Sequence, residues 1–170
     1  MTITSFTDEY TSPVPPSRIF RASIVDSHNL MPKLMPQAIK SIEFVQGNGG
    51  AGTIKQINFP EVFSDCGFFS ACGNFKSIKY RIDEINEEKF VYKYTLIEGD
   101  ALVDKLEKII YEVKFEQSPD GGSISKVTST YYKEGDFKLK EEEIKAGKEK
   151  VSGMYKAVEA YLIQNPDAYA

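Results

Sequence analysis

Residues 108–116 read KIIYEVKFE, and this stretch decides the fold. Apolar or aromatic side chains alternate along it with charged ones: the first set is Ile109, Tyr111, Val113 and Phe115, and the second is Lys108, Glu112, Lys114 and Glu116. Successive side chains of a strand point to opposite faces of a sheet. The alternation therefore predicts a strand in an antiparallel sheet with one covered face and one face in water.

Similar patterns on both sides of this stretch predict six more strands, at residues 2–11, 39–46, 53–59, 78–82, 90–96 and 125–133. The glycines Gly47, Gly49, Gly50 and Gly52 lie between the second and third of the seven strands. They predict a tight hairpin, because glycine adopts positive φ without a steric penalty. A phosphate-binding loop is disfavoured, since that motif needs a lysine and a hydroxyl residue directly after it and then a helix.

Helices are expected in two places. Pro16 opens a short helix through Ile24, and a second short helix runs from about Ser27 to a stop at Pro36. Residues 140–164 carry apolar side chains at helical spacing, and Asn165-Pro166 ends the pattern. These residues predict one amphipathic helix of about 37 Å. Helices collected on one side of an antiparallel sheet give an α+β fold.

The composition limits the possible partners. The chain of 170 residues is 41% hydrophobic and carries a net charge of -4, so one domain over residues 1–170 is expected, and nucleic acid is disfavoured as a partner. The first residues contain acidic side chains and prolines rather than an apolar leader or span, which predicts a cytoplasmic protein. Cys66 and Cys72 are expected to be reduced thiols. We expect no metal ion and no cofactor, and a monomer or weak dimer.

Five motifs stand out along the chain: GNGGAG with Ile54-Lys55 behind it, YTLIEGD at residues 94–100, LEKI at 106–109, PDGGS at 119–123 and KAVEAYL at 156–162. Together they resemble the birch-pollen major allergen and the class 10 pathogenesis-related plant proteins. The resemblance extends over nearly the whole chain. It implies a seven-stranded sheet gripping the long helix, two short helices in a V, and a large internal cavity. It also implies binding of flavonoids, cytokinins, sterols or fatty acids, a role in plant defence or stress, and allergenicity.

The inward phase of three strands and one side of the long helix supply the candidate ligand-binding residues. They are Ile78, Tyr80, Ile82, Tyr92, Tyr94, Tyr111, Val113, Gly147, Val151 and Met154. Tyrosine combines an apolar ring with a hydroxyl, which suits planar ligands with polar edges. Periodicity alone favours an ordinary packed core for these side chains, whereas the resemblance favours the lining of a cavity.

Catalysis is the alternative function. The residues implicated in the ribonuclease activity ascribed to the family correspond to Lys55, Glu107, Glu159 and Tyr161. The acidic net charge favours surface salt bridges and a solvated helix face for them instead. Norcoclaurine synthases are also relatives of this family, and Lys126 occupies a place similar to their catalytic lysine. A solvent-facing role is favoured for Lys126, because the rest of that catalytic set has no match here.

One departure from the family pattern concerns residues 61–76. This segment is about ten residues longer than the usual loop between the third and fourth strands by the family resemblance, and it contains Phe68 and Phe69. An ordinary loop is the favoured interpretation, and a lid over the cavity mouth is the alternative.

Overall fold

The computed structural model describes residues 2–36, 39–58, 77–98, 106–133, 135 and 141–170. The strands form one antiparallel sheet of seven in the order β1-β7-β6-β5-β4-β3-β2. Their bounds are β1 (Thr2–Ser12), β2 (Ser41–Gln46), β3 (Ile54–Asn58), β4 (Ser77–Asn86), β5 (Val91–Glu98), β6 (Leu106–Gln117) and β7 (Ser123–Lys133). The predicted seven-stranded antiparallel sheet is confirmed.

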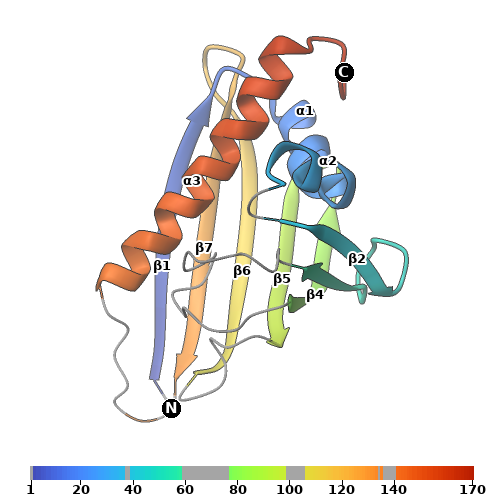
Figure 1. Ribbon diagram of the computed structural model, residues 1–170. Helices are drawn as coiled ribbons and strands as arrows, with labels where there is room; N and C mark the ends of the chain where they lie inside the picture. The colour runs from blue at the N-terminus through green and yellow to red at the C-terminus, as the bar shows by residue number, and fades with distance from the viewer. Residues whose placement is uncertain (1, 37–38, 59–76, 99–105, 134, 136–140) are drawn as a thin grey trace.

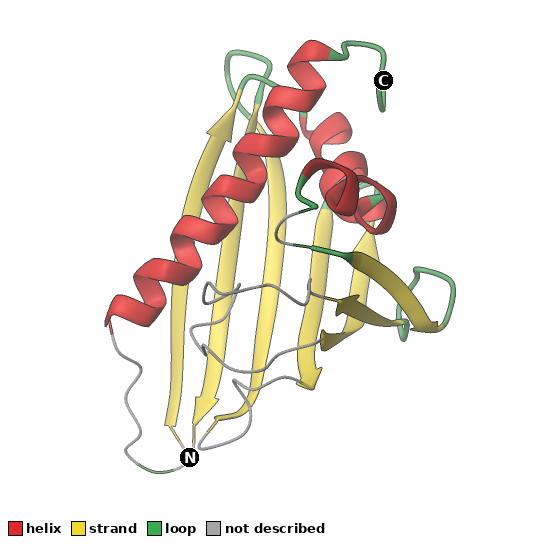
Figure 2. Cartoon of the chain, in the orientation of Figure 1, coloured by secondary structure: helices red, strands yellow, loops and turns green. Residues whose placement is uncertain are grey.

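The helices of the described chain are α1 (Pro16–Phe20), the π-helical turn η1 (Arg21–Val25), α2 (Ser27–Leu34) and α3 (Glu141–Gln164). Figure 1 shows α3 running obliquely in front of β1 and β7, with α1 and α2 near the end of α3 that leads to the C-terminus. The helices thus lie on one side of the sheet (Figure 2), which confirms the α+β architecture. None of the helices in the described part of the chain is both long and apolar enough to cross a bilayer.

The first short helix differs from the prediction, because it is not a regular α-helix through to Ile24. Beyond Phe20 it widens, and the Asp26 amide donates to the Arg21 carbonyl five residues back, at 2.9 Å. The Ser23 hydroxyl donates to the Ile19 carbonyl at 2.5 Å. A serine that bonds back to the preceding turn competes for a carbonyl of the helix ladder, which favours the wider turn.

The chain crosses the molecule between its first two strands. β1 and β2 follow each other in sequence but form the opposite edges of the sheet, and α1, η1 and α2 span the distance between them. The strand register is interrupted between Phe44 and Gln46 in β2, and again within β4 and β6. Such irregularities increase the local twist and bend of a sheet.

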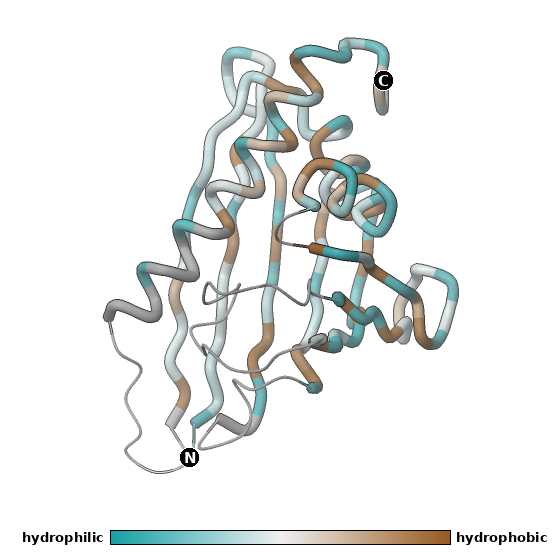
Figure 3. Tube along the Cα trace, in the orientation of Figure 1, coloured by the Kyte–Doolittle hydropathy of each residue, from teal (hydrophilic) through white to brown (hydrophobic). Residues whose placement is uncertain are grey.

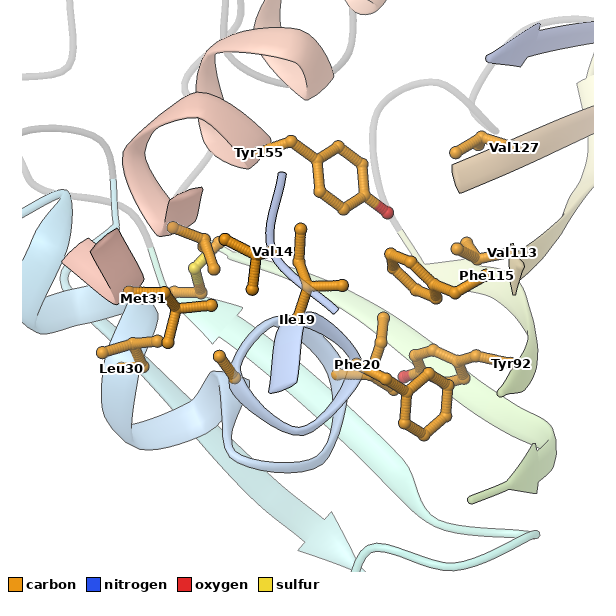
Figure 4. Packing of buried hydrophobic residues seen from close by; sticks show 14 of the residues in the cluster. Val14, Ile19, Phe20, Leu30, Met31, Tyr92, Val113, Phe115, Val127 and Tyr155 are labelled. Carbon is orange, nitrogen blue, oxygen red and sulfur yellow. The ribbon is translucent and has the colours of Figure 1, made fainter. Parts of the chain in front are cut away.

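A hydrophobic core joins the short helices, α3 and the inner face of the sheet, which is the face that α3 covers. Phe20 of α1 is fully buried, with its ring 5.7 Å from that of Phe90 and 5.8 Å from that of Phe115. Figure 4 shows Tyr155 of α3 directed towards the same group of side chains. Hydrophobic and hydrophilic residues follow one another along β6 and along the C-terminal half of α3 (Figure 3), as the sequence pattern predicts.

Arg18 fastens the C-terminal end of α3 to the short helices. Its guanidinium donates to the carbonyls of Leu162, Asn165 and Ala168 at 3.0 to 3.1 Å. The last carbonyls of a helix have no partner within the helix, and a cation there also complements the negative helix end. Arg18 therefore satisfies acceptors that would otherwise need water.

Replacing Arg18 with methionine is expected to lower the free energy of unfolding by about 1–3 kcal/mol, because these charge-assisted bonds are lost while the apolar stem is kept. Urea unfolding measures this change. Arg21→Met is the matched control, since within the described chain the Arg21 side chain forms one hydrogen bond, to the carbonyl of Ala170 at 3.4 Å. A control effect as large as that of Arg18→Met would contradict the assignment of Arg18 as the fastening residue.

Candidate ligand-binding site

A cluster of tyrosine rings occupies the inner face of the sheet. We define the tyrosine cluster as Tyr80 of β4, Tyr92 and Tyr94 of β5, and Tyr111 of β6. The Tyr94 ring stacks on that of Tyr111, with centroids 4.9 Å apart and planes 17° apart. It also lies 4.9 Å from Tyr92 and meets Tyr80 edge-on at 5.0 Å. Strand register brings the rings together, because Tyr94 lies directly opposite Tyr111 in the β5–β6 pair.

The tyrosine cluster is shielded from water. Tyr80, Tyr92 and Tyr111 are between 5% and 8% exposed, and Tyr94 is half-buried. Burial raises the pKa of all four phenols, and it is the largest cause in each case. Neighbouring tyrosines raise the pKa values further. The four hydroxyls are therefore neutral across the physiological pH range, so each can donate and accept a hydrogen bond.

Three inner hydroxyls have no protein partner among the described residues. No side chain or backbone group in that part of the chain forms a hydrogen bond with the hydroxyl of Tyr92, Tyr94 or Tyr155. Tyr155 extends from α3 towards the sheet, with its ring 5.5 Å from that of Tyr10 and 6.0 Å from that of Phe115. The three hydroxyl oxygens are also not among the fully buried unpaired side-chain atoms of the described chain, so they are available to water or to a ligand.

The remaining predicted ligand-binding residues lie on the same inner face or on α3. Ile78, Ile82 and Val113 are buried, and Ile82 and Val113 belong to the packed core. Val151 and Met154 are half-buried and pack against that core. Gly147 lies on α3. The sequence did not single out Tyr10 or Tyr155 as site residues, although both fall on the inward phase of their elements.

Lys55 departs most clearly from expectation, because it does not form a surface salt bridge. It is only 7% exposed, and its ammonium donates to the Ser27 hydroxyl of α2 at 2.6 Å. The ammonium also lies 5.8 Å from the centroid of the Tyr92 ring. Burial lowers the pKa of Lys55 to about 8. Lys55 is thus a polar group at the border of the tyrosine cluster.

Of the other candidate catalytic residues, Glu159 and Tyr161 have no described contact with Lys55. Glu159 and Tyr161 are half-buried on α3, and the Lys33 ammonium lies 5.7 Å from the Tyr161 ring. Among the described residues no hydrogen bond or ion pair joins Lys55 to either of them. For Glu107 the structure gives a place on β6 and nothing of its side chain. The described contacts therefore do not bring the residues implied for ribonuclease activity together in one site.

Lys126 lies on the outer face of the sheet. Its ammonium is 3.3 Å from Glu116 and 3.9 Å from Glu9, and the side chain is 40% exposed. Its neighbours Ser125 and Val127 on β7 are buried, so Lys126 has the outward phase. This lysine points away from the tyrosine cluster.

The glycine loop forms the predicted hairpin between β2 and β3. Gly47, Gly49 and Gly52 have φ values of 88°, 106° and 88°, whereas Gly50 is not in the positive-φ region. The Gly49 amide donates to the Thr53 hydroxyl, and the Gly52 amide donates to the Ile82 carbonyl at 2.7 Å. With these amides engaged inside the protein, the loop has the structure of a tight turn and not of a phosphate cradle.

Residues 61–76, which the sequence predicts to be a longer loop, lie outside the described residues. The same is true of Cys66 and Cys72.

An antiparallel sheet that holds one long C-terminal helix on its inner face defines the helix-grip class of proteins. Residues 1–165 match the family described as Pathogenesis-related protein Bet v 1 family. The chain belongs to this family, which confirms the resemblance seen in its motifs.

The relatives are plant proteins that align with this chain over almost their whole length. The chain is 50% identical to the major strawberry allergen Fra a 1-2 of Fragaria ananassa, over 99% of each chain. It is also 50% identical to the major allergen Pru av 1 of Prunus avium, again over 99% of each.

Solved structures of related chains share the fold. Ara h 8.0201 superimposes with a TM-score of 0.78 at 38% identity, covering 96% of this chain and 100% of that one. Norcoclaurine synthase from Thalictrum flavum, solved with dopamine and hydroxybenzaldehyde, gives a TM-score of 0.70 at 16% identity, over 96% of this chain and 88% of that chain. At that identity the likeness concerns the fold alone.

Proposed function

We propose that this chain binds a small, planar, amphipathic plant metabolite, such as a flavonoid or a cytokinin, between the inner face of the sheet and α3, and carries or stores it. The tyrosine cluster is the observation on which the proposal depends. Its rings offer apolar surfaces for stacking, and its neutral hydroxyls offer hydrogen bonds to phenol or carbonyl groups. A site of this kind selects for shape and polarity rather than for one compound.

The unpartnered hydroxyls of Tyr92 and Tyr94 support this proposal. A hydrogen bond from a ligand to one of these hydroxyls is worth about 0.5–1.5 kcal/mol net, because it replaces a bond to water. A flavonoid-sized molecule that hides about 300 Å² of apolar surface gains roughly 7 kcal/mol before losses of rigid-body freedom. Affinities of about micromolar strength are therefore expected.

The proposal includes a biological setting: a cytoplasmic protein of plant defence or stress that also acts as an allergen. The description of the family as pathogenesis-related supports the role in defence. The relatives' names as major allergens of strawberry and cherry species support the allergenicity.

Catalysis is not part of the proposal. Ribonuclease chemistry needs a general base and a general acid on opposite sides of one phosphate. No described hydrogen bond or ion pair joins Lys55 to Glu159 or Tyr161. This observation and the net charge of -4 favour ligand binding over RNA cleavage.

Displacement of the neutral dye Nile red by the flavonoid naringenin tests the proposal. The wild-type protein is expected to bind the dye and to release it when naringenin is added. Tyr94→Phe removes one hydroxyl and keeps the ring, so the affinity for naringenin is expected to fall about 3- to 10-fold while the fold is unchanged.

Tyr132→Phe is the matched control, because Tyr132 lies outside the tyrosine cluster, where its ring meets the ammonium of Lys108 at 4.5 Å. This variant is expected to bind naringenin like the wild type. If the dye does not bind, or if both variants lose affinity equally, the assignment of the site to the tyrosine cluster is wrong.

A further inference from the structure

Lys55 is an amine that lies inside the protein among neutral groups. It is 7% exposed, and strand pairing sets it opposite Phe44 of β2 and Tyr80 of β4. Its nitrogen lies 5.8 Å from the centroid of the Tyr92 ring. Among the described residues no carboxylate forms an ion pair with it. Such surroundings stabilise the neutral amine relative to the ammonium, compared with water.

One hydroxyl holds this amine in place. The Lys55 nitrogen donates to the Ser27 hydroxyl at 2.6 Å, and that hydroxyl donates its own hydrogen to the Ile24 carbonyl at 3.1 Å. Ser27 therefore acts only as an acceptor towards Lys55. A neutral amine keeps this bond through one N–H, and its lone pair has no donor among the described residues. The lone pair is thus available to an electrophile.

The described carboxylates on neighbouring elements are engaged elsewhere. Asp26 accepts a hydrogen bond from the Tyr169 hydroxyl at 2.5 Å, and Asp83 of β4 accepts one from Arg81 at 2.8 Å. The cost of burying the ammonium is therefore not offset, and burial lowers the pKa of Lys55 to about 8. At neutral pH the neutral fraction is then about two orders of magnitude larger than for a lysine in water.

From this arrangement we infer that Lys55 is a nucleophilic amine that forms an imine with an aromatic aldehyde lying against the tyrosine cluster. A lysine desolvated in an apolar pocket is an activated nucleophile towards carbonyl compounds. The inference rests on the proposed function, because the aromatic body of the aldehyde would take the place of the amphipathic guest. It adds a covalent step and a ligand class, the aldehydes.

The covalent step needs no reactant besides the aldehyde. The lone pair of the neutral amine attacks the carbonyl carbon, a C–N bond forms, and the carbonyl electron pair moves to the oxygen, which takes up a proton. The nitrogen gives up a proton to leave a carbinolamine. Its hydroxyl is protonated and leaves as water while the nitrogen lone pair forms the C=N bond, and the nitrogen releases its last proton. One aldehyde and one amine thus give one imine and one water, without oxidation or reduction.

Naphthaldehyde together with sodium cyanoborohydride tests the inference, because the hydride reduces the imine to a stable secondary amine. Intact mass measures the number of adducts, and peptide mapping measures the labelling rate at each position. At neutral pH we expect Lys55 to be labelled at least about 10-fold faster than Lys126, since its larger neutral fraction outweighs the weaker nucleophilicity of a less basic amine. Mapping also separates these adducts from labelling of the α-amine, whose ordinary pKa is near 8.

Lys55→Met keeps the length of the side chain and removes the amine. The fastest lysine adduct is expected to disappear in this variant, while labelling at the other positions is unchanged. Lys126→Met, which removes a lysine from the outer face, is the matched control and is expected to keep rapid labelling of Lys55. In wild-type protein unfolded in urea, the preference for Lys55 is expected to vanish, because burial of the amine is lost.

Equal labelling rates of Lys55 and Lys126 in the folded wild type would overturn the inference, and so would a preference for Lys55 that persists in urea. Naphthalenemethanol has the same ring system and forms no imine, so its displacement of Nile red measures binding alone. If this alcohol displaces the dye and Lys55 is not labelled preferentially, the proposed function stands and the inference about Lys55 fails. If neither the dye nor the alcohol binds and Lys55 is not labelled, both fail.

Discussion

Replacing Phe20 with alanine is expected to lower the free energy of unfolding by about 3–5 kcal/mol. The ring is completely buried and meets the rings of Phe90 and Phe115, so its removal leaves a space that surrounding side chains fill only in part. Phe20 also joins α1 to β5 and β6, since its two ring partners flank or belong to those strands. Urea unfolding monitored by circular dichroism measures the change.

Phe6→Ala is the control for size and chemistry. Phe6 of β1 is half-buried, and it has one described ring contact, with Tyr131 at 5.8 Å. We expect a loss of less than half that of Phe20→Ala, because less surface is removed from contact. If the two variants lose equal stability, the description of Phe20 as the central link between the short helices and the sheet is wrong.

Replacing Lys55 with methionine is expected to stabilise the ligand-free protein. Burial lowers the pKa of Lys55 from its ordinary 10.5 to about 8. That gap corresponds to about 3 kcal/mol of destabilisation by the buried charge at neutral pH. An apolar side chain of the same length removes this cost, so the variant is expected to unfold at higher urea concentration than the wild type.

The gain should depend on pH in a defined direction. Below about pH 8 the folded and unfolded wild-type chains both carry the ammonium of Lys55, and the folded chain bears the whole cost. Between about pH 8 and 10.5 only the unfolded chain keeps the proton, so wild-type stability rises relative to the variant. The advantage of Lys55→Met is therefore expected to be constant below this interval and to shrink across it.

Lys126→Met provides the comparison for that experiment. Lys126 is partly exposed and forms surface ion pairs, so its replacement is expected to change stability by less than about 1 kcal/mol. If Lys55→Met is no more stable to urea than the wild type, or if the stability difference does not change with pH, the burial of a charged Lys55 is contradicted.

The sequence predicts the sheet well because its strands bury one face. In β6 the buried Ile109, Tyr111, Val113 and Phe115 are those that the alternation assigns to the covered face. β3 shows where this method fails. Its residues Ile54-Lys55-Gln56-Ile57 have no alternation, so the sequence does not decide which side chains point inward. Pairing with Tyr80 and packing against α2 decide it, and they bury Lys55.

The sequence predicts that the tyrosines of the cluster lie on the inner face of the sheet, but it does not predict which rings contact each other. Alternation assigns Tyr92, Tyr94 and Tyr111 to the inner side of their strands. The contact between Tyr94 and Tyr111 depends on the register between β5 and β6, which a single sequence does not fix. The sequence does not predict the π-helical turn for a similar reason. The turn depends on the hydrogen bond from the Ser23 hydroxyl to the Ile19 carbonyl, and the sequence does not show which acceptor that hydroxyl uses.

The crowding of phenol rings has an optical consequence. The chain contains ten tyrosines and no tryptophan, so no indole masks the emission of the phenols. Because four of these rings lie together on the inner face, an aromatic guest stacked against them would quench the intrinsic ultraviolet fluorescence and alter the near-ultraviolet circular dichroism. The protein thus contains a built-in reporter of its own occupancy, which needs neither a label nor a dye.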